Sequence, residues 1–343
     1  MGSGSTRSCL DGKTILVTGG TGSFGQQFVD VVLRTRRPEA IRIYSRDELK
    51  QQQMQRRFPD KRVQCLIGDV RDQERLNRAM RGVEIVIHAA ALKQVPACES
   101  NPFEAVKTNV LGAANVIDAA IDCGVERVLA ISTDKAVSPV NLYGATKLCA
   151  EKLFVQGNFH AGGGGIRLSC ARYGNVVGSR GSVIPLFLEQ RSNRTLLVTD
   201  RRMTRFWITM EQGVEFVLSC LDRMQGGEIF VPKIPSMRLM DLASAIAPEC
   251  AITFTGIRPG EKLHELLVSP DEAWHTREFP EMFVILPVAD PEFDATSWAV
   301  GKPLPDGFIY SSETNPVRLS VEQLREMLSQ LVQDDSLMAG VEG

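Results

Sequence analysis

The sequence predicts an α/β protein in which a doubly wound parallel sheet is followed by a smaller mixed α/β domain. Two observations lead to this fold class. Short runs of Val, Ile and Leu alternate with longer stretches of helical periodicity across residues 10–172, and glycines directly follow the first of these runs. Successive strands with a helix between them are joined by right-handed crossovers, and such crossovers make neighbouring strands parallel.

The expected elements follow from the spacing of apolar residues. Buried strands are expected at 13–18, 40–44, 64–67, 85–88 and 127–132, because each is a short run rich in apolar residues. Phe24, Phe28, Val31 and Val32 recur at helical spacing. This pattern, and similar ones further along, predict helices at 24–36, 73–80, 102–123, 143–159, 211–223 and 321–331.

Gly-rich turns and shorter elements after residue 172 mark a change in organisation. We expect residues 10–172 to form the large domain, with 206–228 packing back onto it. Residues 173–205 and 229–290 are expected to form the smaller domain. Residues 291–343 begin with a stretch rich in Pro, Asp and Gly, and they are expected to form a tail with a closing helix.

The composition narrows the range of partners. The net charge is −2 and there is no basic block, so nucleic acid is not an expected partner. No apolar run approaches the roughly 18 residues needed to span a bilayer, so no membrane is expected. The 8 cysteines form no C-x-x-C pair, which is typical of reduced thiols in the cytoplasm. Only 4 histidines are present, without clustered ligands, so no metal site is predicted.

Three glycines, Gly19, Gly22 and Gly25, stand between the first expected strand and the first expected helix. In a dinucleotide-binding turn the first glycine permits the turn, the second lets the backbone approach a pyrophosphate, and the third lets the helix pack on the strand. Backbone N–H groups at the start of the helix then hold the phosphates. This context predicts a Rossmann-type sheet with a dinucleotide cradle formed by Gly19, Thr21, Gly22, Ser23, Phe24 and Gly25.

The residues after the second expected strand indicate which dinucleotide binds. NAD-preferring sites place Asp or Glu there to bond the ribose 2′-hydroxyl. Here Ser45 and Arg46 come first, and a hydroxyl with a guanidinium suits a 2′-phosphate, which predicts NADP. The alternative is that Arg46 is a solvated charge and Asp47 serves NAD. The ends of the third and fourth strands are expected to line the rest of the cofactor with Asp69, Val70, Ala89, Ala90 and Ala91.

Tyr143 and Lys147 lie four residues apart on a predicted helix and therefore share a face. A lysine ammonium and an oxidised nicotinamide nearby would favour the tyrosine phenolate and lower its pKa. Tyr143 can then take the proton from a substrate hydroxyl while hydride leaves the carbon. The same spacing also fits an exposed tyrosine and lysine, but the glycine cradle upstream favours the catalytic interpretation.

Longer motifs extend this pattern, at residues 18–25, 45–48, 88–93, 132–136, 141–147, 172–176, 178–183, 203–207 and 258–262. With these motifs the sequence resembles the extended short-chain dehydrogenase/reductases. Among them it is most similar to the UDP-N-acetylglucosamine 4,6-dehydratases, especially the 5-inverting enzymes of pseudaminic acid biosynthesis. The resemblance covers roughly residues 10–290. It implies that the large domain binds NADP and the smaller domain binds the nucleotide sugar.

The resemblance implies a reaction that leaves the cofactor unchanged. C4 of the sugar is oxidised, C5 loses a proton, the C6 hydroxyl leaves and hydride returns to C6. Hydroxide is a poor leaving group and needs an acid, a role that the resemblance assigns to Asp134. It assigns the C5 base to Lys135, and Thr133 would orient the O4 hydroxyl. Burial must then keep Asp134 protonated, and we expect burial and the Lys147 cation to keep Lys135 partly neutral.

Several residues in the second half of the chain suit a UDP-sugar. Arg205 and Arg258 are expected to pair with its phosphates, and Glu261 to accept a ribose hydroxyl. Each arginine taken alone would more often be a surface residue, but their motifs reverse that preference. The resemblance implies further substrate contacts at Lys93, Asn175, Ser182, Val183, Thr199 and Met203.

The predicted function is therefore NADP-dependent 4,6-dehydration of UDP-N-acetylglucosamine with inversion at C5, giving a UDP-4-keto-6-deoxy-L-arabino-hexosamine. Two related activities remain as alternatives, a C5-retaining dehydratase and a C4 epimerase. An epimerase would need only Tyr143 and Lys147. A non-catalytic NADP-binding sensor is a third alternative. Analogy with this scaffold also suggests a homo-oligomer, either a dimer or a hexamer.

Overall fold

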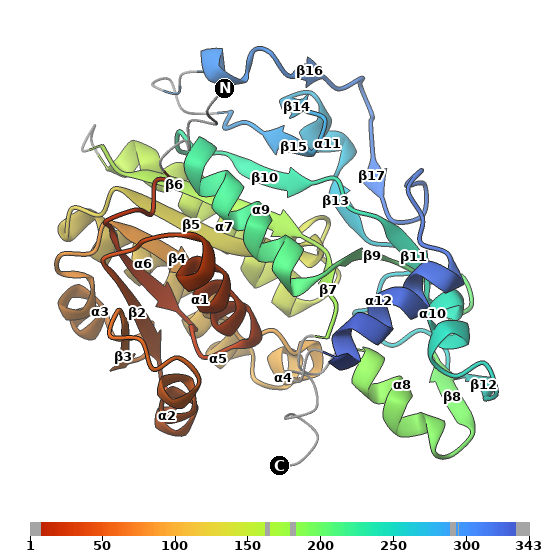
Figure 1. The fold of residues 1–343 in the computed structure, drawn as a ribbon. Coiled ribbons are helices and arrows are strands. Elements are labelled where there is room, and N and C mark those ends of the chain that lie inside the picture. The colour runs from red at the N-terminus through yellow and green to blue at the C-terminus, as the bar shows by residue number, and fades with distance from the viewer. Residues whose placement is uncertain (1–7, 162–164, 179–182, 289–292, 294, 334–343) are drawn as a thin grey trace, which may run out of the picture.

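A central parallel sheet organises the chain (Figure 1). The computed structural model describes residues 8–161, 165–178, 183–288, 293 and 295–333. The parallel strands are β1 (Thr14–Thr18), β2 (Ala40–Ser45), β3 (Val63–Ile67), β4 (Ile85–His88), β5 (Arg127–Thr133), β6 (Arg167–Tyr173) and β10 (Ile229–Pro232). Their order in the sheet is β3-β2-β1-β4-β5-β6-β10. The doubly wound parallel sheet predicted from the sequence is confirmed.

Helices cover both faces of this sheet (Figure 1). In that view α1 (Ser23–Thr35) and α9 (Met210–Arg223) lie in front of the strands, whereas α3 (Gln73–Met80), α6 (Gly112–Asp122) and α7 (Leu142–His160) lie behind them. The apolar stripe that predicted α1 is the stripe that it buries, since Phe28 and Val32 are fully buried. Each such side chain contributes about 1.5–3 kcal/mol to stability.

The expected helix at 102–123 is interrupted. It consists of α5 (Pro102–Val106), a π-helical turn (Lys107–Leu111) and α6. The Asn109 side chain, in the π-helical turn, accepts from Leu92 N at 2.8 Å and donates to Leu92 O at 2.9 Å, in the loop after β4. It also donates to Thr146 Oγ1 on α7 at 3.0 Å. Turns of this kind often mark functional sites. Apolar periodicity does not reveal it, because the flanking turns keep the ordinary α-helical spacing.

A second apolar core lies beside the main sheet. Its strands are β7 (Asn175–Val176), β8 (Thr195–Val198), β9 (Thr204–Ile208), β11 (Ser236–Arg238) and β12 (Ala251–Phe254). Its helices are α8 (Val183–Arg191), α10 (Leu239–Ile246) and α12 (Val321–Gln333). Phe187, Trp207, Leu242 and Leu324 meet in its interior. Residues from 175 to 324 therefore contribute to one smaller unit.

The boundary expected between residues 228 and 229 does not coincide with the edge of the main sheet. Strand β10 pairs with β6, and β15 (Met282–Ile285), β14 (Thr276–Glu278) and β16 (Lys302–Pro303) continue the sheet beyond it. The expected tail also contributes β17 (Tyr310–Ser311), which pairs with β13 (Leu266–Val268). The C-terminal residues thus connect the two units. The sequence did not predict these pairings, because strands of two or three residues are too short to show a period in the apolar residues.

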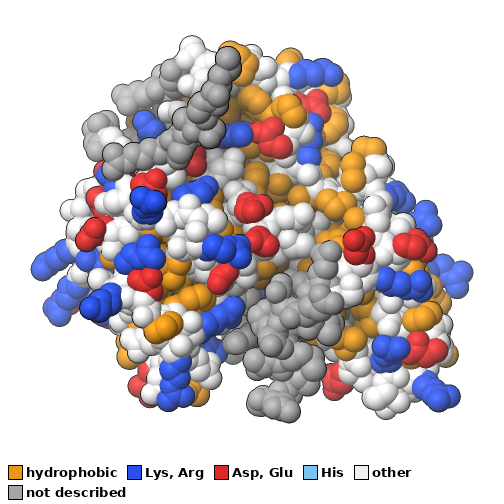
Figure 2. All heavy atoms as spheres, viewed as in Figure 1, with side chains coloured by type: hydrophobic (Ala, Val, Ile, Leu, Met, Phe, Trp, Pro, Cys, Tyr) orange, Lys and Arg blue, Asp and Glu red, His pale blue; other side chains and the backbone are white. Residues whose placement is uncertain are grey.

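The surface carries both charge signs. On the face shown in Figure 2, Lys and Arg side chains are interspersed with Asp and Glu over the described part of the chain, in keeping with a net charge of −2. Among the described helices, none has the length and apolarity required to cross a membrane.

Candidate active site

The glycine-rich turn joins β1 to α1 under steric limits that favour glycine. Gly19 adopts φ +65°, and a Cβ on it would lie 2.8 Å from Ala90 Cα. A Cβ on Gly25 would lie 2.2 Å from the carbonyl oxygen of Gly20. Helix α1 has no side-chain cap at its N-terminus, which leaves its first N–H groups for another acceptor. The turn, with Thr21, Gly22, Ser23 and Phe24, therefore fits the diphosphate of a dinucleotide.

Beyond the end of β2, an exposed arginine and an aspartate have different roles. The Asp47 carboxylate caps α2 (Glu48–Arg57), accepting from Lys50 N at 3.0 Å. Ser45 is buried, whereas the Arg46 side chain is 53% exposed and its Nη1 lies 3.6 Å from Asp69 Oδ2. Asp47 is therefore committed to the helix cap, while Arg46 can reach a ligand. The other predicted cofactor residues follow β3 and β4 at the same edge of the sheet: Val70, Ala89, Ala90 and Ala91.

Helix α7 brings Tyr143 and Lys147 to the end of β5. Lys147 is buried and donates from Nζ to the carbonyl oxygen of Ile131 at 2.7 Å. Burial raises the pKa of Tyr143 to about 12, and the cation that opposes this rise most is Lys135. The sequence-based expectation combined Lys147 with an oxidised nicotinamide, and for that combined environment a lowered tyrosine pKa stays a prediction. Burial outweighs the neighbouring charge, because a phenolate loses more hydration than the ammonium restores.

Asp134 and Lys135 lie in a short 3-10 turn (Asp134–Ala136) directly after β5. Asp134 is fully buried, and its Oδ1 accepts from Thr133 Oγ1 at 2.9 Å and from Lys135 Nζ at 3.0 Å. Its Oδ2 has no hydrogen-bond partner among the described residues. Burial raises the pKa of Asp134 above its usual range, as expected for a carboxyl group that must hold a proton.

The turn is pressed against the start of α7. A Cβ on Gly144 would lie 2.1 Å from the carbonyl oxygen of Lys135, so the two backbones approach as closely as glycine permits. Asn141 caps α7, with Oδ1 accepting from Gly144 N at 2.8 Å, and its Nδ2 donates to the Gly260 carbonyl oxygen at 2.8 Å. The positions of Tyr143 and of the Asp134–Lys135 pair are thus fixed relative to each other through backbone contact.

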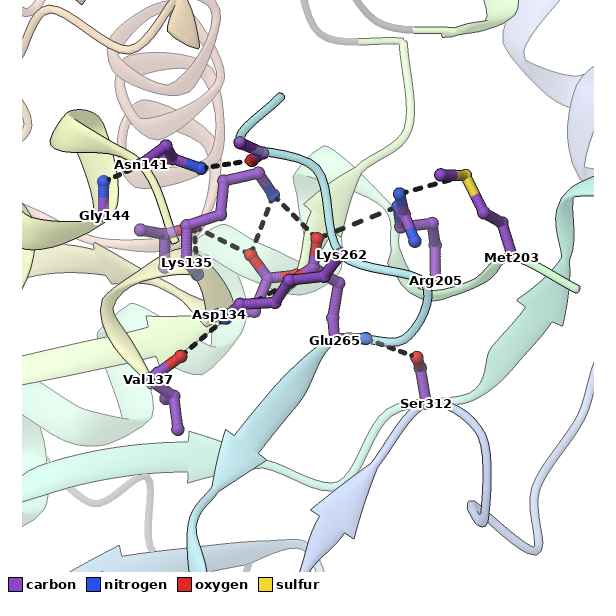
Figure 3. Close-up of polar contacts among 12 residues, drawn as sticks. Asp134, Lys135, Val137, Asn141, Gly144, Met203, Arg205, Lys262, Glu265 and Ser312 are labelled. Atoms are coloured by element: carbon purple, nitrogen blue, oxygen red, sulfur yellow. Dashed lines mark hydrogen bonds and ion pairs between the residues drawn. The ribbon is translucent and has the colours of Figure 1, made fainter. Parts of the chain in front are cut away.

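A carboxylate that the sequence did not predict completes this cluster (Figure 3). Glu265 is 3% exposed. Its Oε1 lies 3.6 Å from Lys135 Nζ and 3.8 Å from Arg205 Nε, and its Oε2 lies 3.9 Å from Lys262 Nζ. Lys262 also donates to the Val137 carbonyl oxygen at 2.6 Å. Because Glu265 meets Lys135 only through the tertiary fold, the sole sequence signal is its place just after the 258–262 motif.

The charge of Lys135 differs from the expectation. Burial by itself lowers the pKa of Lys135, but Asp134 and Glu265 outweigh burial and hold the pKa above its usual range. The prediction of a partly neutral lysine is therefore wrong for the pair at rest, since two carboxylates share the one ammonium. Burial lowers the pKa of the Lys147 amine.

A buried ion pair lies behind the catalytic turn. Arg172 and Glu151 are each 1% exposed, and Arg172 Nη2 lies 2.7 Å from Glu151 Oε2 and 2.8 Å from Glu272 Oε1. Ser132 Oγ donates to Glu151 Oε1 at 2.5 Å, directly before the Thr133–Asp134 step. The network joins β5, β6, α7 and α11 (Pro270–Ala273), so it holds the elements that carry the predicted catalytic residues.

The predicted substrate residues are brought together only in part. Asn175 Oδ1 and Glu261 Oε2 are buried without a hydrogen-bond partner among the described residues, which leaves them for a ligand. Arg205 Nη2 donates to the sulfur of buried Met203 at 3.5 Å. Arg258 is exposed, and so is Lys93. Val183 and Thr199 are half-buried, and Ser182 lies outside the described residues. The described side chains hold no group of three His, Cys, Asp or Glu suited to a metal ion.

Comparisons with known proteins find relatives that match most of the chain. A family model described as polysaccharide biosynthesis protein matches residues 15–287. The chain is 52% identical to the UDP-N-acetylglucosamine 4,6-dehydratase (inverting) of Campylobacter jejuni strain 81-176, over 93% of this chain and 98% of the relative. It is 40% identical to the UDP-glucose 4-epimerase of Rickettsia massiliae, over 92% and 95%. The X-ray structure of Pen from Bacillus thuringiensis matches with a TM-score of 0.86 at 38% identity, over 94% of this chain and 99% of that chain.

Proposed function

The chain belongs to this family of polysaccharide biosynthesis proteins, and we propose that it catalyses NADP-dependent 4,6-dehydration of UDP-N-acetylglucosamine with inversion at C5. One observation carries the proposal. A buried carboxyl group and an ammonium group, those of Asp134 and Lys135, lie 3.0 Å apart in the turn against which the helix of Tyr143 is packed. A simple dehydrogenase has no use for such a pair, whereas loss of water from C5 and C6 needs both a base and an acid.

The cradle at Gly19, Gly22 and the start of α1 would hold the diphosphate of NADP, and Arg46 would meet its 2′-phosphate. The capping role of Asp47 supports NADP over NAD, because that carboxylate is already bonded to Lys50 N. When bound, the cofactor supplies reversible acceptance of hydride from C4 and its return to C6. The protein residues supply every proton step.

Tyr143 takes the proton of the sugar O4 hydroxyl, and Thr133 orients that hydroxyl. Because burial raises the pKa of Tyr143 to about 12, the phenolate needs further positive charge beside it. Lys135 provides part of that charge, and the oxidised nicotinamide would provide the rest. Lys147, whose Nζ donates to the Ile131 carbonyl oxygen, lies one helical turn after Tyr143 on α7.

One proton transfer converts the Asp134–Lys135 pair into its reactive form. Moving the proton over 3.0 Å from Lys135 Nζ to Asp134 Oδ1 leaves a neutral amine and a carboxylic acid. The amine then accepts the C5 proton, which the C4 ketone has made acidic. The acid donates its proton to O6 as the C6–O bond breaks, so that water leaves. The pair ends with the number of protons it began with, because the amine gains the C5 proton while the acid gives one to O6. When hydride returns to C6, a proton is delivered to C5, and it balances the proton that Tyr143 took from O4.

Arg205 and Arg258 would pair with the phosphates of UDP, while Asn175 and Glu261 offer unpartnered polar atoms to the substrate. The resemblance also leads us to propose that the product enters pseudaminic acid biosynthesis in the cytoplasm. We also propose that the chain assembles into a homo-oligomer, either a dimer or a hexamer.

A C4 epimerase is the second candidate, and the match to UDP-glucose 4-epimerases favours it. Tyr143 and Lys147 would suffice for that reaction, whereas the buried Asp134 would then hold a proton without use. A C5-retaining dehydratase would use the same pair. Incubation with UDP-N-acetylglucosamine and NADP tests the proposal: a 4-keto-6-deoxy product supports it, and a C4 epimer with an intact C6 hydroxyl refutes it.

A further inference from the structure

Glu265 contributes a buried negative charge to the candidate site (Figure 3). It lies on the segment before β13 and approaches three cations: Lys135, Arg205 and Lys262. The three nitrogen–oxygen distances are 3.6–3.9 Å, longer than the 3.0 Å between Lys135 and Asp134. Glu265 therefore acts mainly through its charge, because its Oε2 makes no hydrogen bond among the described residues.

Ser312, directly after β17, holds the main chain of Glu265 in place. Ser312 Oγ accepts from Glu265 N at 2.9 Å, and Ser312 N donates to the Glu265 carbonyl oxygen at 2.9 Å. Ser312 Oγ also lies 2.8 Å from Thr204 Oγ1, beside Arg205 on β9. The neighbouring pairing of β13 with β17 extends the contact. The main chain of Glu265 is thus fixed by two hydrogen bonds to Ser312.

Two carboxylates share the Lys135 ammonium, and their environments shift the pKa values of the two groups in opposite directions. Burial raises the pKa of Glu265, but the three cations more than offset burial and bring it below its usual range. Burial raises the pKa of Asp134, and Glu265 adds to that rise. The groups facing Lys135 come from every surrounding element: Asp134 on its own turn, Tyr143 on α7, Lys93 after β4, Arg205 on β9, and Lys262 and Glu265 before β13.

We propose that Glu265 is a positioning residue for the dehydration step, whose fixed negative charge holds Lys135 beside Asp134 and keeps one proton on that pair. The inference rests on the proposed function. An anion next to the pair stabilises the state that contains the proton over the state that has lost it. Without that anion, the pair releases its proton at lower pH and no acid remains for O6. Glu265 touches no reacting atom, so its effect appears in the protonation of other groups.

The test compares the pH profile of kcat for the wild type and Glu265→Gln, with UDP-N-acetylglucosamine as substrate and NADP present. Both limbs of the profile are expected to move to lower pH by about one unit, because both report on the shared proton. At a pH on the alkaline limb, kcat falls about tenfold. Glu313→Gln is the matched control, since it removes an exposed carboxylate from the same C-terminal segment, 58% exposed and 3.5 Å from His264. Its limbs should stay in place.

Glu265→Asp keeps the charge and should return the limbs toward the wild-type positions. If Glu265→Gln does not fold, Glu265→Asp alone tests the inference. Its shorter side chain withdraws the carboxylate from Lys135, so both limbs of its pH profile should lie at lower pH than in the wild type, by less than one unit. A uniform loss of kcat with unmoved limbs overturns the inference and leaves a packing role. If the wild type forms no 4-keto-6-deoxy product, the proposed function fails instead. Titration of the Asp134 carboxyl by 13C NMR then decides on Glu265, and an unchanged midpoint in the variant overturns the inference.

Discussion

The ammonium of Lys135 lies 3.0 Å from the carboxylate of Asp134, its neighbour in the chain. The two side chains differ in solvent exposure, since Asp134 is fully buried and Lys135 is 26% exposed. A single turn after β5 therefore presents an amine to the pocket and keeps a carboxyl group behind it. Under the proposed function, that arrangement would supply the base and the acid of the dehydration from two consecutive residues.

Replacement of Lys135 by alanine should separate the redox step from proton removal at C5. Lys135→Ala is expected to keep NADP binding and to reduce exchange of the C5 proton with solvent by about 10²–10⁴-fold, the usual contribution of a general base. Exchange is measured by NMR in deuterated water, and NADP affinity by fluorescence titration. Lys61→Ala, which alters an exposed lysine, is the control. Exchange at the wild-type rate in Lys135→Ala would remove this residue from the base role.

A methyl group at Gly144, on α7, should also disturb proton removal at C5, because Gly144 packs against the backbone of Lys135. Its Cβ would lie 2.1 Å from the Lys135 carbonyl oxygen, so Gly144→Ala must push the turn and α7 apart. We expect kcat to fall by about 10²-fold, since misplacement by about 1 Å can cost that much. Gly213→Ala is the matched control on α9, where the nearest atom is 4.0 Å away. That variant should keep full activity and gain roughly 0.5–1 kcal/mol in helix stability. Equal activities of the two variants would contradict the backbone packing described above.

The sequence predicted these elements unevenly, for physical reasons. The parallel strands and α1 were predictable because their apolar periods are local. Asp134, Lys135, Tyr143 and Lys147 could be singled out because they share two short motifs. Glu265 could not be found in this way, since it reaches Lys135 only through the tertiary fold. The raised pKa of Lys135 also depends on this unseen partner, so the sign expected from burial alone was wrong.

The choice of cofactor should reverse with one substitution. Arg46→Asp replaces the half-exposed guanidinium after β2 by a carboxylate, which repels a 2′-phosphate and can accept from a ribose hydroxyl. The ratio of NADP to NAD affinity is expected to fall by at least about tenfold, as measured by isothermal titration calorimetry. Arg57→Asp, on the exposed side of α2, serves as a control for charge alone. An unchanged ratio in Arg46→Asp would refute the contact with the 2′-phosphate.

Acid should weaken the fold through Glu272. Burial opposes ionisation of this carboxyl, but Arg172 outweighs burial and lowers its pKa from 4.5 to about 2. Since the folded pKa is depressed, the stabilisation is present above about pH 4.5 and is lost as the pH falls through about 2. Urea denaturation of Glu272→Gln should show a loss of up to about 3 kcal/mol at pH 7 that shrinks toward pH 2. A difference between wild type and variant that does not depend on pH would contradict this role of the ion pair.

The most direct test of the whole account is the NMR spectrum of the product formed from UDP-N-acetylglucosamine in deuterated water. The account predicts a 4-keto sugar with a methyl group at C6, deuterium at C5, and the inverted C5 configuration. Retention at C5 would contradict the stereochemical part. A product that keeps its C6 hydroxyl and carries no deuterium at C5 would contradict the central claim that Asp134 and Lys135 remove water.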